Sequence, residues 1–138
     1  MQGDEPEMEP AHIDRLVGML ADGGADMATL AAPLDAAAAE EPSNVKVVLA
    51  ADGSAMYFSR ARIPFDRDGE GRVRYLLHLG IYAYRKAFLL AFAAMPSGVA
   101  ERIEKLEQLR VLEVGHKIVV GVVPSAAPGI DTMQDYEA

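Results

Sequence analysis

Near its start the chain carries apolar residues at the spacing of an amphipathic helix, with polar residues between them. Pro10 stands in the first turn of this pattern, where a proline is tolerated, and Gly23-Gly24 follows as a stop signal. The pattern predicts a helix over Pro10 to Asp22 with one apolar face. That face would consist of Ile13, Leu16, Val17 and Leu20.

Four other stretches have the patterns of β-strands. Met27 to Ala32 is a short apolar run, which predicts a buried strand. Apolar residues alternate on both sides of Asp52-Gly53, so Val45 to Arg60 is predicted to form a hairpin. Tyr75 to Arg85 also alternates, and Lys117 to Val123 is rich in β-branched residues, so each is predicted to be a strand.

The predicted strand over Tyr75 to Arg85 has two different faces, because successive side chains of a strand point to opposite sides. His78 and Tyr82 are four residues apart and therefore share one face, which is polar and aromatic and also holds Gly80 and Tyr84. The other face is apolar and is expected to lie on the core. It consists of Leu77, Leu79, Ile81 and Ala83.

Three further segments have helical patterns. Pro33 to Glu41 is rich in Ala and acidic residues and predicts a short helix, and Lys86 to Met95 predicts a short apolar helix. Val99 to Val114 has apolar residues at helical spacing and Gly115 in the position of a C-terminal cap, which predicts one continuous helix. Its apolar face would include Ile103, Leu106 and Leu109.

Residues 61–74 are predicted to form a mobile surface loop, because they combine Pro, Gly and charged residues. Arginines in and beside this loop could form a local basic patch for an anionic ligand. A solvated charged loop is the alternative interpretation, since three acidic residues in the same stretch offset the arginines. The arginines are Arg60, Arg62, Arg67, Arg72 and Arg74, and the acidic residues are Asp66, Asp68 and Glu70.

The composition is that of one globular domain, with 138 residues, 51% of them hydrophobic and 25% charged. A formal net charge of −8 disfavours nucleic-acid binding, which depends on clustered Lys and Arg. No apolar stretch approaches the ~20 residues that cross a membrane, so neither nucleic acid nor membrane is expected as a partner. Cysteine is absent, which fits a cytoplasmic protein and excludes disulfides and thiolate metal sites.

Short general motifs point to no particular enzyme class. The sequence has no P-loop, no dinucleotide-binding glycine fingerprint, no zinc-protease motif and no serine-hydrolase elbow. His12, His78 and His116 do not have the spacing of metal ligands, so a zinc site is not expected.

Six segments in order along the chain carry a more specific pattern. Together they resemble the CMP-Kdo synthetases, which are 3-deoxy-manno-octulosonate cytidylyltransferases. The segments are Gln2–Pro6, Asn44–Val48, Tyr57–Arg60 with Ile63–Asp68, His78–Tyr84, Ile103–Arg110 and Gly129–Thr132.

The resemblance implies a three-layer, Rossmann-like α/β fold of the nucleotide-diphosphosugar-transferase type, with a mixed, mainly parallel sheet. Residues 1–138 would then be a partial cytidylyltransferase domain, namely the sugar-binding and dimerisation half. The family's N-terminal CTP-binding segment has no counterpart in this sequence. A homodimer is implied, with the hairpin and the arginine-rich loop forming a lid over the sugar and a dimer contact.

The implied reaction is the attack of the anomeric hydroxyl of the sugar acid Kdo on the α-phosphate of CTP. It gives CMP-Kdo and pyrophosphate for lipopolysaccharide biosynthesis in the cytoplasm. Magnesium held by carboxylates suits the charge that develops, and by resemblance its ligands and the catalytic residues are Asp4 and Asp131. The alternative is that Asp4 closes a turn and Asp131 caps a final helix, which is predicted to begin at Asp131 or Thr132.

The resemblance also assigns a set of residues to Kdo. His78 could instead be a structural histidine, and Glu107 could be a helix surface charge paired with Lys105 or Arg110. In the predicted helix Glu107 and Gln108 would be adjacent and close to the edge of the core. The Kdo-binding set is Gln2, Arg60, His78, Tyr82, Glu107 and Gln108.

Three functions therefore remain open. In the first, the chain belongs to a Kdo cytidylyltransferase but does not complete the transfer by itself, because the nucleotide loop is absent and phosphoryl transfer depends on positioning. In the second, it belongs to the related synthetases that activate sialic acids. In the third, it is a non-catalytic half-domain that binds a sugar acid or forms a dimer through exposed strand edges.

Overall fold

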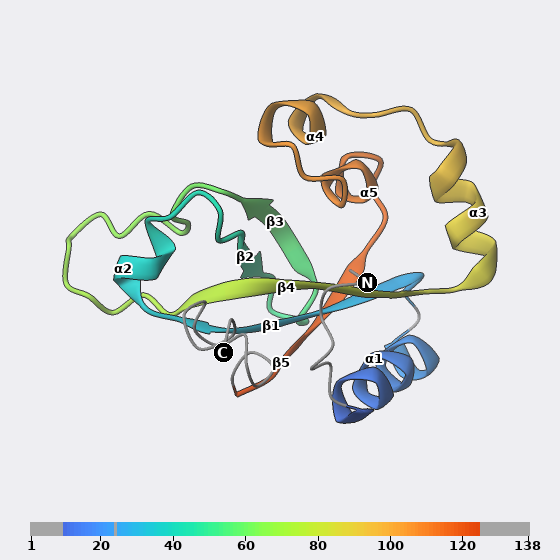
Figure 1. Ribbon diagram of the computed structural model, residues 1–138, viewed down its shortest axis with the longest axis horizontal. Coiled ribbons are helices and arrows are strands. Elements are labelled where there is room, and N and C mark those ends of the chain that lie inside the picture. Colours follow the sequence, from blue (N-terminus) through green and yellow to red (C-terminus); the bar gives the residue numbers. More distant parts are fainter. Residues whose placement is uncertain (1–9, 24, 125–138) are drawn as a thin grey trace, which may run out of the picture.

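The computed structural model describes residues 10–23 and 25–124, which form three layers (Figure 1). One helix covers one face of a five-stranded sheet, and three helices lie on the other face. The lone helix is α1 (Pro10–Gly23), and the three helices are α3 (Lys86–Ala94), α4 (Val99–Glu104) and α5 (Leu109–Glu113). The strand order is β3-β2-β4-β1-β5. The strands are β1 (Met27–Leu34), β2 (Lys46–Leu49), β3 (Ala55–Ser59), β4 (Tyr75–Tyr84) and β5 (Ile118–Val122).

Strand β1 lies in the interior of the sheet and is buried on both faces. One face carries Ala28 and Leu30, which pack in a cluster with Leu16 of α1. The other face carries Met27 and Ala31, which join a second cluster with side chains of the hairpin and of α3 and α5. Because β1 is covered from both sides, its sequence is almost entirely apolar.

The sheet is mixed, as the resemblance implied, but parallel pairing does not dominate it. Strand β1 runs parallel to β5, with Met27 opposite Ile118, and the other pairs of the described strands are antiparallel. For β2 and β3 the physical reason is local, because a tight turn joins them and such a turn can only connect antiparallel strands. The β2–β3 turn lies against β5 at the other edge of the sheet, where Val120 N donates to Gly53 O at 3.1 Å.

Most predicted elements are confirmed, including α1, β1, the β2–β3 hairpin, β4, α3 and β5. Residues 61–74 contain neither helix nor strand, which agrees with the predicted loop. The Ala-rich helix is shorter than expected. It is α2 (Ala36–Ala39), and its N-cap Asp35 accepts a hydrogen bond from Ala38 N at 2.7 Å. Pro33, the predicted helix start, instead continues β1.

The continuous helix predicted over Val99 to Val114 is wrong. The chain leaves the helix at Lys105, which has a left-handed backbone with φ of 60°, and becomes helical again at Leu109. Leu106 turns into the core, whereas Ile103 of the predicted apolar face is 77% exposed. A break therefore replaces the middle of the helix, and Glu107 and Gln108 lie in a turn.

Gln2, Asp4, Asp131 and the predicted final helix lie outside the described residues. In the part of the chain that the structure describes, no helix has the length and apolar character needed to cross a membrane.

Candidate functional site

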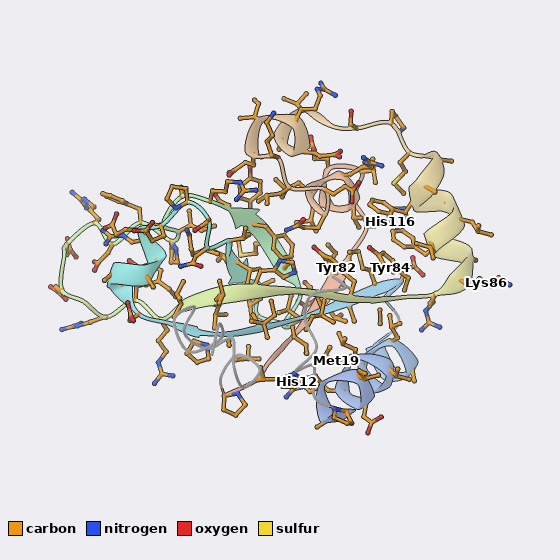
Figure 2. All side chains as sticks on the ribbon, viewed as in Figure 1. His12, Met19, Tyr82, Tyr84, Lys86 and His116 are labelled. Carbon is orange, nitrogen blue, oxygen red and sulfur yellow. The ribbon has the colours of Figure 1, made fainter. Side chains whose placement is uncertain are left out.

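The polar face of β4 carries a row of aromatic side chains. The ring centroids of His78 and Tyr82 are 5.2 Å apart, and those of Tyr82 and Tyr84 are 6.0 Å apart. Tyr82 and Tyr84 lie on the side of the sheet that faces α5, and Met19 lies on the other side with α1 (Figure 2). The predicted division of this strand into two faces is confirmed, with Ile81 packed in the cluster on the α1 side. The expectation that only the apolar face lies on the core is wrong, because Tyr82 and Tyr84 pack against the larger core cluster under α3 and α5.

A bulge at Gly80 interrupts the pairing of β4 with β1. Thr29 lies opposite Tyr82, and Ala31 lies opposite His78. Moving two positions along β1 therefore corresponds to moving four positions along β4, so β4 has two extra residues at the bulge. Gly80 has φ of 75°, a left-handed conformation that glycine adopts without the penalty of a Cβ atom. The bulge keeps His78 and Tyr82 on one face and locally breaks the hydrogen-bond ladder between the strands.

His78 is 9% exposed and is held by specific contacts. Its Nε2 atom lies 2.9 Å from Thr29 Oγ1, and the edge of its ring meets the Phe58 ring with centroids 4.9 Å apart. Burial lowers the pKa of the His78 ring from its usual 6.5 to about 4. The ring is therefore neutral at pH 7 and can take part in a site through hydrogen bonds rather than through charge.

The two tyrosines that continue the row are also kept neutral. Burial raises the pKa of Tyr82, and the neighbouring Tyr84 and the Glu107 carboxylate raise it further. Burial and the Glu107 carboxylate also raise the pKa of Tyr84. Both shifts agree with a Glu107 carboxylate that lies in the neighbourhood of the tyrosine row.

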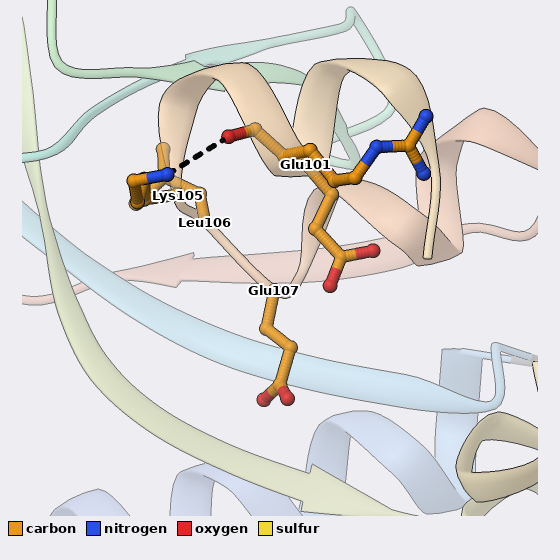
Figure 3. A pocket seen from close by; sticks show the side chains of 5 residues that line it. Glu101, Lys105, Leu106 and Glu107 are labelled. Atoms are coloured by element: carbon orange, nitrogen blue, oxygen red, sulfur yellow. Dashed lines mark hydrogen bonds between the residues drawn. The ribbon is translucent and has the colours of Figure 1, made fainter. Parts of the chain in front are cut away.

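Glu107 and Gln108 belong to the turn between α4 and α5. Glu107 is exposed, and Figure 3 shows its side chain pointing away from α4 and Lys105 toward the sheet. Gln108 is only 5% exposed. The Lys105 ammonium donates to Arg102 O at 3.5 Å. Glu107 lines a hollow together with Glu101, Arg102, Lys105 and Leu106 (Figure 3).

The alternative in which Glu107 is a paired surface charge does not hold among the described residues. Arg110 forms its ion pair with Glu101, with Nη2 and Oε2 2.6 Å apart. Within residues 10–23 and 25–124, neither Arg110 nor Lys105 makes a salt bridge to Glu107. The Glu107 carboxylate is thus available to a ligand on the tyrosine side of the turn.

Arg60 anchors the turn through hydrogen bonds to main-chain carbonyls. Its guanidinium donates to Glu104 O at 2.8 Å, to Lys105 O at 3.2 Å and to Pro42 O at 3.1 Å. The first two carbonyls belong to the end of α4, immediately before the turn that carries Glu107 and Gln108. The structure therefore brings His78 and Tyr82 together on β4, places Glu107 in the turn between α4 and α5, and makes Arg60 an anchor of that turn.

Two residues of this region were missed by the sequence analysis. Lys46 is fully buried, and its ammonium donates to the carbonyls of Glu41, Asn44 and Arg60. Burial lowers the pKa of Lys46. Thr29 is also fully buried and is bonded to His78. For Thr29 a signal did exist, because it is the one polar residue within the apolar run of Met27 to Ala32.

The described residues contain no group of three or more His, Cys, Asp and Glu side chains that could hold a metal ion. The predicted magnesium ligands Asp4 and Asp131 lie outside them. The site that the structure describes is thus an uncharged donor and acceptor face on β4 opposite one carboxylate.

Comparison with known proteins gives a consistent result. The profile of a family described as cytidylyltransferase matches residues 1–118. A 3-deoxy-manno-octulosonate cytidylyltransferase from Acidobacterium capsulatum is 48% identical over 138 residues, covering 100% of this chain and 56% of that protein. One from Rhodopirellula baltica is 47% identical, covering 100% of this chain and 59% of that protein.

A solved structure gives the same picture at the level of the fold. It is the CMP:2-keto-3-deoxy-manno-octonic acid synthetase complexed with CTP, with a TM-score of 0.88 and 43% sequence identity. The match covers 99% of this chain and 57% of that one. The chain spans about half the length of the curated relatives that it matches. With the fold, the order of the segments and the family profile in agreement, this chain belongs to the cytidylyltransferase family.

Proposed function

We propose that this chain carries the sugar-acid-binding part of a CMP-Kdo synthetase, which transfers CMP from CTP to Kdo. The observation that carries the proposal is the contact of the neutral His78 and Tyr82 rings on β4, below the turn whose Glu107 side chain points toward the sheet. A polyhydroxylated sugar needs both hydrogen-bond donors and acceptors at fixed positions, and these three side chains supply them.

The roles of the site residues follow from their chemistry. The Tyr82 hydroxyl donates to or accepts from a sugar hydroxyl, and the Glu107 carboxylate accepts from one. The Gln108 amide supplies one more donor and acceptor from the same turn. Arg60 neutralises the sugar carboxylate with the guanidinium N–H groups that the carbonyls leave over. Gln2 completes the proposed set.

In the proposed reaction the anomeric oxygen of Kdo forms a bond to the α-phosphorus of CTP. The bond from that phosphorus to the bridging oxygen breaks, pyrophosphate leaves, and the hydroxyl proton passes to solvent or a base. Asp4 and Asp131 are the proposed magnesium ligands, on the basis of the resemblance, and the metal would neutralise the phosphate charge. The test is a Mg²⁺ titration of pyrophosphate release in a protein of the relatives' length that contains this sequence, where Asp4→Asn should weaken the metal dependence.

Kdo is favoured over sialic acids by the relatives, since the curated proteins compared above are named 3-deoxy-manno-octulosonate cytidylyltransferases. On the basis of the resemblance, we place this step in lipopolysaccharide biosynthesis in the cytoplasm. We also propose a homodimer. Val99 and Ile103 support it, because they are one helical turn apart on α4 and are 61% and 77% exposed, and neighbouring exposed apolar side chains can mark an interaction surface. Analytical ultracentrifugation of the chain and of Ile103→Glu tests the dimer.

The test of the proposed function is direct binding of Kdo to the chain, measured by titration calorimetry. Kdo should bind, and Glu107→Gln and Tyr82→Phe should each weaken binding about tenfold, or about 1.4 kcal/mol. Tyr57→Phe on the exposed side of the hairpin is the matched control and should bind normally. Because the chain spans about half of its relatives, we expect no pyrophosphate release from CTP and Kdo by the chain alone.

Two outcomes would contradict the proposal. Tighter binding of a sialic acid than of Kdo would move the chain to the sialic-acid synthetases. Absence of any sugar-acid binding, with a folded protein, would remove the role of β4 and leave dimer formation as the function of this half.

A further inference from the structure

We propose that Thr29 is a positioning residue that fixes the tautomer of His78, so that Nδ1 faces the ligand as a hydrogen-bond acceptor. This inference rests on the proposed function and deepens it, because it states what the sugar must offer at this position. The partner of Nδ1 is a hydroxyl group that donates its proton.

The inference follows from the hydrogen bonds of one hydroxyl. Thr29 Oγ1 lies 2.6 Å from Ile81 O and 2.9 Å from His78 Nε2. A carbonyl oxygen can only accept, so the single proton of the Thr29 hydroxyl is donated to Ile81 O. The Thr29 oxygen must then accept in the second bond, which requires a proton on His78 Nε2.

The remaining ring nitrogen is thereby defined. A neutral imidazole carries one proton, and burial keeps this ring neutral at pH 7. With that proton on Nε2, the Nδ1 atom holds a lone pair. Among residues 10–23 and 25–124, no group forms a hydrogen bond to Nδ1. In the same ranges, one side-chain nitrogen or oxygen is both shielded from solvent and without a hydrogen-bond partner. It belongs to His12 and not to His78.

The Gly80 bulge makes this arrangement possible. Pairing between β1 and β4 is irregular between Thr29 and Ala31, so the Ile81 carbonyl lies within reach of the Thr29 side chain. The ring itself is clamped by Phe58 at 4.9 Å and by Tyr82 at 5.2 Å between centroids. The bulge and the contacts with Phe58 and Tyr82 together hold the His78 ring with Nε2 toward Thr29. The Nδ1 edge of the ring is then the one that can contact the ligand.

The consequence is a rule of specificity. A site whose acceptor is fixed rejects an analogue that lacks the donating hydroxyl, because the lone pair would lose its partner. The Nδ1 lone pair also distinguishes a ligand hydroxyl, which can donate a proton to it, from a group of similar size that can only accept. We expect a Kdo analogue with the relevant hydroxyl replaced by hydrogen, or blocked as a methyl ether, to bind roughly tenfold more weakly.

The experiment measures the tautomer and the binding separately. In the ¹⁵N-labelled chain at pH 7, two-bond ¹H–¹⁵N correlation spectra should show His78 with a protonated Nε2 and an unprotonated Nδ1. Thr29→Val should shift the ring toward a mixture of tautomers and weaken Kdo binding roughly tenfold. Thr29→Ser retains the hydroxyl and should restore both the tautomer and the binding, which a merely structural role of the threonine volume would not do.

Each other result is decisive. A wild-type ring protonated at Nδ1, or Thr29→Val without change in tautomer or affinity, overturns the inference. If Thr29→Val does not fold, the wild-type spectrum and Thr29→Ser still decide it. If wild-type chain shows the Nε2–H tautomer but binds no Kdo, the proposed function and the ligand part of the inference fail, and only the control of the tautomer by Thr29 survives.

Discussion

Glu101 and Arg110 form a buried, two-pronged ion pair across the break between α4 and α5. Arg110 Nη2 lies 2.6 Å from Glu101 Oε2, and Nε lies 2.9 Å from Oε1. The hydrogen bonds from Arg110 lower the pKa of the Glu101 carboxyl, although burial opposes this effect. The pair connects the two short helices whose intervening turn holds Glu107 and Gln108.

Removing one partner of this pair should destabilise the protein. Arg110→Ala leaves the Glu101 carboxylate buried without its cation, and we expect a loss of about 3 kcal/mol in the free energy of unfolding. Urea unfolding followed by circular dichroism measures it. The double variant Glu101→Gln with Arg110→Met should recover much of the loss, and equal stability of wild type and Arg110→Ala would contradict the role of the pair.

Acid should destabilise the chain through His78. The unfolded chain takes up a proton at this ring below about pH 6.5 and the folded chain only at about pH 4, so acid between these values favours unfolding. The contribution is complete above pH 6.5 and falls by about 3 kcal/mol as the pH drops to 4. Urea unfolding at several pH values should show a smaller loss in His78→Gln than in wild type. His116→Gln, a substitution of a half-exposed ring, is the control.

Gly80→Ala should weaken the bulge without a steric clash. A Cβ atom at Gly80 meets nothing within 4 Å, so the cost is the left-handed backbone, about 1 to 2 kcal/mol. Kdo binding should weaken as well, because the bulge places Ile81 O beside Thr29. Gly18→Ala on α1 also has open space but no positive φ, and it should stabilise the helix by about 0.5 to 1 kcal/mol. Equal effects at the two glycines would disprove the conformational explanation.

Arg60→Lys should loosen the turn of the site although the charge is kept. A lysine cannot reproduce the three hydrogen bonds that the guanidinium donates to Glu104, Lys105 and Pro42 carbonyls. We expect a stability loss of about 1 to 3 kcal/mol and faster amide hydrogen exchange around residues 105–108. Arg72→Lys, whose side chain is 85% exposed, should change neither quantity. Unchanged exchange in Arg60→Lys would show that Arg60 does not anchor the turn.

The parts of the fold that could be predicted are those with a local signal. The alternation along Tyr75 to Arg85 correctly put His78 and Tyr82 on one face and Ile81 on the other, because strand periodicity alone sets the side on which a residue lies. It could not show that the His78 face is also covered by a core cluster. The prediction failed at Val99 to Val114, where the spacing was helical but the backbone breaks at Lys105. There the carbonyls of Glu104 and Lys105 bond to Arg60, 44 and 45 positions away in the sequence.

The sequence by itself therefore determined the order and type of most elements, the two faces of β4 and the resemblance to one family. These depend on the spacing of neighbouring residues and on short motifs. Only the tertiary structure decided that Glu107 lies in a turn facing the tyrosine row and that Thr29 meets His78, 49 positions apart. Such contacts arise when distant segments pack together and buried polar groups find their partners, and neither effect leaves a periodic signal in the chain.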